Sequence, residues 1–80
     1  MSPDKLVYMA NQIGKFFAST GHDTAVEGIS DHIAKFWEPR MRKQIYAHMA
    51  TNGGVDLDPL VKEALQLLER KDAGEMTAAK

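Results

Sequence analysis

Apolar residues along the chain recur at steps of three and four, the spacing that places side chains on one face of an α-helix. Four segments show this pattern, over residues 3–20, 24–37, 39–51 and 59–70. In the first two, the apolar positions are Leu6, Met9, Ala10, Ile13, Phe16 and Phe17, then Val26, Ile29, Ile33, Phe36 and Trp37. In the last two, they are Met41, Ile45 and Met49, then Leu60, Val61, Ala64, Leu65 and Leu68. Since no segment shows the sustained alternation typical of a β-strand, the sequence predicts an all-α fold.

Residues at the ends of these segments are typical of helix boundaries. Ser2 is a good N-cap because its hydroxyl can accept a hydrogen bond from a free amide of the first turn, and the proline after it suits position N1. Asp58 is likewise followed by a proline, and the second segment has Asp23 or Thr24 as its cap. The predicted stops are Gly21, the Glu38-Pro39 step and the run 52–54.

The apolar pattern stops after Arg70, and residues 71–80 are charged and rich in small side chains. We therefore expect one helical domain over residues 1–70, a compact array of three to four short helices, followed by a flexible, disordered tail over 71–80. A domain of this size often needs disulfides, a metal or a partner for stability. The chain has no cysteine, so a partner is the support we would look for.

Charge and hydropathy narrow the range of functions. The formal net charge of −1 gives no general attraction to nucleic acid or anionic lipid. No apolar run approaches the roughly 20 residues that a membrane span needs, and the first five residues do not resemble a signal peptide. We expect a cytoplasmic protein that binds neither membrane nor nucleic acid.

The sequence contains few residues in patterns suited to catalysis or metal binding. Three histidines, His22, His32 and His48, lie in three different segments, whereas a metal site would favour two on one helix face. His32 precedes Phe36 by one helical turn, so we expect it to pack on that ring. Hydroxyl residues flank turns, and no glycine-rich phosphate loop is present. The sequence predicts no catalytic, cofactor-binding or metal-binding residue.

Residues 35–43 are the most informative stretch, with four cations, one acid and the only tryptophan, which lies two residues before a proline. Tryptophan, arginine and methionine are favoured in the cores of interfaces, and Arg40 and Arg42 could each hold a carboxylate or a phosphate in a bidentate fork. A second interpretation stays open, in which Phe36 and Trp37 belong to the core and the cations are solvated. Under the docking interpretation, the partner-binding residues are Tyr8, Lys35, Trp37, Pro39, Arg40 and Arg42.

Two glycines, Gly14 and Gly28, lie inside predicted helices. Each costs up to about 1 kcal/mol relative to alanine. Each can mark a close helix crossing, either within the fold or against a partner.

Two blocks of the chain resemble a known family. Residues 2–13 are similar to the opening, and residues 32–42 to the central signature, of the delta subunit of the soluble, NAD-dependent, molybdenum-containing formate dehydrogenase. The Gly53-Gly54 pair, residues 57–61 and residues 64–65 follow the same layout, so the resemblance covers roughly Ser2 to Leu68.

The resemblance implies a small accessory subunit that is not itself an enzyme and binds no cofactor. Its partners would be a catalytic alpha subunit, with bis-molybdopterin guanine dinucleotide and iron–sulfur clusters, and beta and gamma subunits that pass electrons through FMN to NAD. The delta subunit would help to assemble or stabilise the alpha subunit, including during insertion of its molybdenum cofactor.

Two other functions are weighed against this one. The helix that begins at Pro39 could belong to a small nucleic-acid-binding module, with Arg40, Arg42 and Lys43 facing phosphates and Lys35 as a further candidate. The near-neutral net charge argues against that function. A small enzyme or metal carrier is the third possibility, and we expect no stoichiometric metal.

Overall fold

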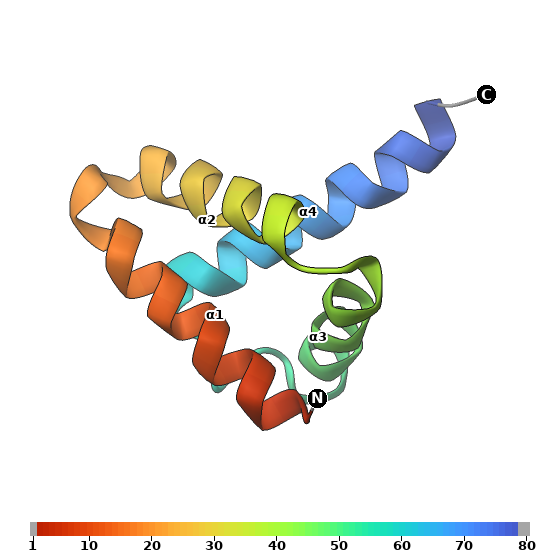
Figure 1. The fold of residues 1–80 in the computed structure, drawn as a ribbon, viewed down its shortest axis with the longest axis horizontal. Coiled ribbons are helices and arrows are strands. Elements are labelled where there is room, and N and C mark those ends of the chain that lie inside the picture. The colour runs from red at the N-terminus through yellow and green to blue at the C-terminus, as the bar shows by residue number, and fades with distance from the viewer. Residues whose placement is uncertain (1, 79–80) are drawn as a thin grey trace.

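The computed structural model describes the backbone of residues 2–78 and the side chains of residues 2–73. The described residues form four α-helices and one short 3-10 turn and contain no strand, which confirms the all-α prediction. The elements are α1 (Pro3–Phe17), η1 (Ala18–Thr20), α2 (His22–Phe36), α3 (Pro39–Asn52) and α4 (Pro59–Ala78). Helices α1 and α2 form a hairpin, α4 packs across both, and α3 closes the side near the N-terminus (Figure 1).

The core lies where the four helices meet. It consists of Leu6, Val7, Ala10, Val26, Ile29, Ile33, Trp37, Ile45, Tyr46, Met49, Leu57, Val61, Ala64, Leu65 and Leu68. Most of these positions belong to the predicted apolar stripes, while Val7, Tyr46 and Leu57 lie outside them. Two stripe residues, Phe16 and Phe36, lie on the surface instead.

The start of α1 agrees with the sequence, and the start of α2 does not. The Ser2 side chain accepts a hydrogen bond from the Lys5 amide, as expected of an N-cap. Helix α2 begins at His22, before the predicted caps Asp23 and Thr24, and no described side chain caps it. Its N-cap is Gly21, whose φ of +96° is readily available only to glycine, and whose carbonyl accepts from the Ala25 amide at 2.8 Å.

The predicted end of α3 agrees with the structure, and the predicted end of α4 does not. Gly53 ends α3 in the left-handed conformation, and its amide donates to the Met49 carbonyl at 2.8 Å, which confirms the predicted stop. The predicted end of the last helix near Arg70 is wrong, because α4 continues to Ala78. Residues 71–78 are mostly good helix formers, so helix propensity favours this extension. Residues 79–80 lie outside the described residues, and the flexibility of the tail stays a prediction.

The two glycines inside helices mark close approaches within the fold. A Cβ atom on Gly14 would overlap the Val61 Cγ2 methyl group, so the missing side chain lets α1 and α4 cross closely. A Cβ atom on Gly28 would lie 2.7 Å from two ring carbons of Phe17, so Gly28 provides the space for that ring on α2. The structure thus decides between the two interpretations that the sequence left open for these glycines.

Candidate docking surface

The corner between α2 and α3 determines which of two adjacent aromatic rings is buried. Glu38 is held extended before Pro39 (φ −64°, ψ 152°), as the proline predicts, and Trp37 is extended as well (φ −97°, ψ 134°). The chain therefore leaves the helix at Trp37, which is 5% exposed and part of the core, while Phe36 is 71% exposed. The expectation of an exposed Trp37 is corrected, because the turn of the backbone places this ring inside the protein.

Arg42 is used within the fold. Its Nε donates to Asp72 Oδ2 at 3.2 Å, and its Nη1 donates to the backbone carbonyls of Trp37 at 3.1 Å and Ala34 at 3.4 Å. The side chain is only 17% exposed. Arg42 therefore ties the end of α2 and the start of α3 to α4, and the expected free guanidinium fork is corrected for this residue.

Tyr46, one turn further along α3, completes this cluster. Its hydroxyl donates to Asp72 Oδ2 at 2.8 Å. Burial, followed by the hydrogen bond to the Asp72 carboxylate, raises the pKa of Tyr46 well above its usual value. Asp72 accepts from both Arg42 and Tyr46, so the cluster holds α4 at a point that the apolar pattern does not reach.

The other four predicted partner-binding residues lie on the surface. Tyr8 is 65% exposed on α1, and Pro39 and Arg40 are exposed at the start of α3. Lys35 is exposed and forms an ion pair with Asp31, one turn earlier on α2, at 3.0 Å. The structure therefore separates the six residues into four that a partner can reach and two, Trp37 and Arg42, that the fold uses. Partner binding by any of the six stays a prediction.

Four aromatic side chains from α1 and α2 contact one another in a row, which we call the aromatic ridge: Phe16, Phe17, His32 and Phe36. The ring centroids are 5.2 Å apart for Phe16 and Phe17, 6.4 Å for Phe17 and His32, and 4.7 Å for His32 and Phe36. The predicted packing of His32 on Phe36 is confirmed. The sequence did not predict this feature, because Phe16 and Phe36 have the same helical spacing as the core residues. Spacing alone does not show which apolar residues of a helix are buried and which lie at the exposed edge of its apolar face.

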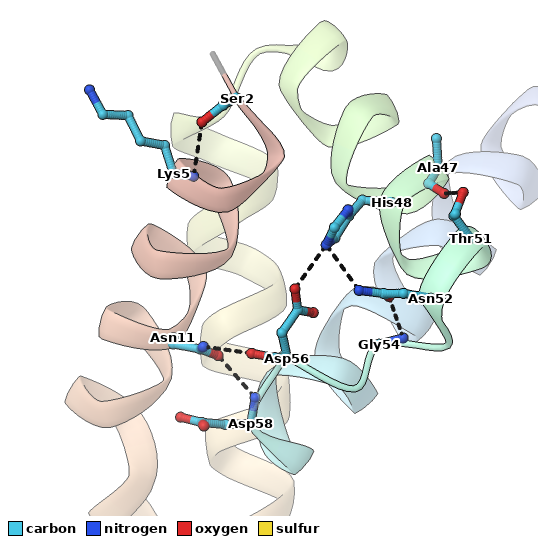
Figure 2. A network of polar contacts seen from close by, with 10 residues as sticks. All are labelled: Ser2, Lys5, Asn11, Ala47, His48, Thr51, Asn52, Gly54, Asp56 and Asp58. Atoms are coloured by element: carbon cyan, nitrogen blue, oxygen red, sulfur yellow. Dashed lines mark hydrogen bonds and ion pairs between the residues drawn. The ribbon is translucent and has the colours of Figure 1, made fainter.

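A polar network holds the loop between α3 and α4 against α1 (Figure 2). The Asn11 side-chain amide donates to the Asp56 carbonyl at 3.1 Å, and its oxygen accepts from the Asp58 amide at 2.9 Å. His48 Nε2 lies 2.9 Å from Asp56 Oδ2 and 3.1 Å from Asn52 Nδ2. The hydrogen bond from His48 lowers the pKa of the Asp56 carboxyl group. These contacts explain His48 as a hydrogen-bonded structural residue.

The third histidine has a comparable role nearer the η1 turn. His22 Nε2, at the start of α2, lies 2.9 Å from Glu63 Oε2 on α4, with both side chains well exposed. This hydrogen bond raises the pKa of His22.

Within residues 2–73, no group of three or more histidine, aspartate or glutamate side chains could hold a metal ion. No helix in the part that the structure describes is long and apolar enough to cross a membrane.

Comparison with known proteins identifies the family. The sequence model of the family described as NADH-dependent formate dehydrogenase delta subunit FdsD matches residues 5–65. The chain belongs to this family. The matched range contains the α2–α3 corner and the whole aromatic ridge, and it confirms the resemblance found in the two sequence blocks. As a delta subunit of formate dehydrogenase, the chain is a component of a complex with several subunits. No curated protein and no solved structure matches the chain.

Proposed function

We propose that this delta subunit is a non-catalytic accessory subunit that docks on the catalytic alpha subunit of an NAD-dependent formate dehydrogenase. There it supports assembly, stability or insertion of the molybdenum cofactor. The observation that carries the proposal is membership of the delta-subunit family over residues 5–65, which include most of the core.

The cofactors of the reaction belong to the other subunits in this proposal. The alpha subunit carries bis-molybdopterin guanine dinucleotide and iron–sulfur clusters, and the beta and gamma subunits carry electrons through FMN to NAD. The delta subunit binds none of these groups and acts in the cytoplasm with its partners.

The distribution of side chains supports a role in protein binding. Polar contacts between distant segments, such as Arg42 with Asp72 and Asn11 with the α3–α4 loop, hold helices together. Aromatic side chains are left on the surface at Tyr8, Phe16 and Phe36. Exposed aromatic residues of this kind are enriched where proteins bind one another.

The alternative, a nucleic-acid-binding module based on α3, is less well supported. Phosphate recognition would use the cations at the start of this helix. Arg42 instead donates to Asp72 and to two backbone carbonyls, which leaves Arg40 and Lys43 as the exposed cations of that helix. Two lysine or arginine contacts give only a small electrostatic contribution to nucleic-acid binding.

The test is to produce the complex with and without this chain. When the alpha, beta and gamma subunits are produced together without this chain, we expect the complex to contain less molybdenum and to show less formate-dependent reduction of NAD. Re-supplying the full chain during expression should restore both, and the purified chain alone should reduce no NAD with formate. Equal molybdenum content and equal activity without the chain would contradict the proposal.

A further inference from the structure

Arg42 and Tyr46 hold a carboxylate between them, and in the free chain this carboxylate is the chain's own Asp72. Arg42 Nε and the Tyr46 hydroxyl group both donate to the same oxygen, Asp72 Oδ2, at 3.2 Å and 2.8 Å. Hydrogen bonds to an ionised acceptor are shorter and stronger than those between neutral groups. Two donors that converge on one oxygen, one of them a guanidinium group, therefore suit a carboxylate ligand.

The two donors are held in place by contacts that do not involve Asp72. Arg42 Nη1 also donates to the backbone carbonyls of Trp37 and Ala34. Tyr46, one turn later on α3, belongs to the core. A site whose donors are already ordered loses little conformational entropy when it binds a ligand. The site is therefore prepared for a carboxylate from another source.

The carboxylate that fills the site comes from a part of α4 outside the core. Leu68 is the last core residue of α4 among the described side chains, and Asp72 lies one turn beyond it. The last turns of α4 project past the other helices (Figure 1). We call residues 71–78 the strap. Detaching the strap exposes little buried apolar surface, and local opening costs least at helix ends of this kind.

The groove beside Tyr46 leaves Arg42 as the charge that selects a ligand. This groove, of about 380 Å³, lies between α3 and α4. Among the described residues, the charged members of its lining are Lys62 and Glu69. Their opposite charges offset each other, so the guanidinium group of Arg42 gives the site its preference for an anion.

The charges on the α2 side of the strap do not form a second site for an anion. Lys71 lines a depression there together with Glu27 and Asp31 of α2. Two acids accompany one cation in this depression, which disfavours an incoming carboxylate. An anionic ligand is therefore directed to the Arg42 side of α4.

The position of the site indicates where its ligand comes from. Both donors lie within residues 5–65, the range that the family model matches, whereas Asp72 lies beyond this range. The bonds from Arg42 to the carbonyls of residues 34 and 37 place the site at the α2–α3 corner. This corner also carries the exposed residues Lys35, Pro39 and Arg40, which we predict to bind the partner. A partner that docks at the corner can bring an acidic side chain to the same two donors.

We propose that the Arg42–Tyr46 site binds an aspartate or glutamate side chain of the alpha subunit, and that the strap closes the site with Asp72 until docking displaces it. This inference rests on the proposed function. One carboxylate replaces another, so the hydrogen bonds lost and gained are of the same kind. The additional contacts that the alpha subunit makes in the open state therefore decide the exchange.

The first experiment asks whether the site accepts a foreign carboxylate, with acetate as the probe. The full chain carrying Asp72→Ala is heated in acetate and in chloride at equal ionic strength. Acetate near its dissociation constant should raise the Tm of this variant by about 2–3 °C more than chloride does. The wild type should show no such difference, because Asp72 fills its site. Glu63→Ala is the matched control, since it removes an exposed α4 carboxylate whose partner is His22.

The second experiment measures binding to the purified alpha subunit. Asp72→Ala removes the internal competitor, so this variant should bind about threefold or more tightly than the wild type. The control Glu63→Ala should bind within about twofold of the wild type. In the wild-type complex, amide hydrogen exchange of residues 71–78 should be faster than in the free chain, because the strap is released.

The outcomes separate this inference from the proposed function. Acetate that stabilises Asp72→Ala no more than chloride does would overturn the site. Equal or weaker binding by a folded Asp72→Ala variant, or unchanged or slower exchange of the strap in the wild-type complex, would overturn the displacement. All of these results leave the proposed function standing when the wild-type chain binds the alpha subunit. A wild-type chain that does not bind would overturn the proposed function and the displacement together. If Asp72→Ala does not fold, the exchange measurement on the wild-type complex decides.

Discussion

Phe36 and Trp37 are adjacent in the chain and have opposite environments. The Phe36 side chain is 71% exposed and that of Trp37 is 5% exposed, because α2 ends between them and the extended backbone at Trp37 directs its ring into the core. The two aromatic residues of the block 35–43 therefore have different roles. Trp37 stabilises the corner between α2 and α3, and Phe36 is available to a partner.

Truncation of the two rings should therefore have different effects on stability. Trp37→Ala removes a large core side chain, and we expect the free energy of unfolding to fall by about 3–5 kcal/mol. Phe36→Ala should change it by no more than about 0.5 kcal/mol. Urea denaturation followed by circular dichroism measures both. Equal losses in the two variants would show that the corner does not separate these rings.

The close crossing of α1 and α4 can be tested at Gly14. Gly14→Ala places a Cβ atom against the Val61 methyl group, so we expect a loss of about 1–3 kcal/mol from overpacking. This loss should exceed the gain in helix propensity, which is up to about 1 kcal/mol. In a double-mutant cycle, Val61→Ala should relieve part of the loss. A Gly14→Ala variant more stable than the wild type would contradict the close approach.

Arg42 and Asp72 should be coupled in stability. Arg42→Ala removes three hydrogen bonds from a largely buried site, and we expect a loss of about 2–3 kcal/mol. Tyr46→Phe, which removes only one hydrogen bond to Asp72, should cost about 1 kcal/mol. A double-mutant cycle between Arg42→Ala and Asp72→Ala measures the coupling, with Arg40→Ala as the exposed control. Additive losses would indicate that the two side chains do not interact.

The Asp56 carboxyl group should contribute to the acid sensitivity of the α3–α4 loop. Its pKa is lowered from 3.8, mainly by the hydrogen bond from His48. A lowered pKa in the folded state gives a stabilising contribution that is present above the unfolded value and is lost as the pH falls through the folded value. Carboxyl NMR titration should show this lowered pKa in the wild type and its return toward 3.8 in His48→Ala. An unchanged pKa in that variant would exclude the hydrogen bond as the cause.

His22 should have the opposite dependence on pH. Its pKa is raised from 6.5, first by the hydrogen bond with Glu63. The contribution of this pair to stability is therefore present below 6.5 and is lost as the pH rises through the higher folded value. Imidazole NMR titration should show the raised pKa, and Glu63→Gln should bring it back toward 6.5. A wild-type pKa in the Glu63→Gln variant would contradict this pairing.

Local rules account for much of the fold. Capping by Ser2, the left-handed stop at Gly53 and the proline that begins α3 depend on a few neighbouring residues, and all three were predicted. The end of α4 was missed, because helix propensity continues beyond Leu68, the last residue of the predicted apolar stripe. The docking site was only partly predicted. The sequence located the informative block, but it left open whether Trp37 is buried or exposed, and it treated Arg42 as a surface cation.

By itself, the sequence determined the helical class, most of the core positions and the family resemblance, because side-chain periodicity, helix caps and a specific residue string are properties of neighbouring positions. Only the tertiary structure decided which aromatic and charged side chains stay exposed on the surface. Arg42 meets Asp72 thirty residues later, and Phe17 meets His32 across the hairpin. Burial at such positions depends on how separate helices cross, which helical spacing within one segment does not specify.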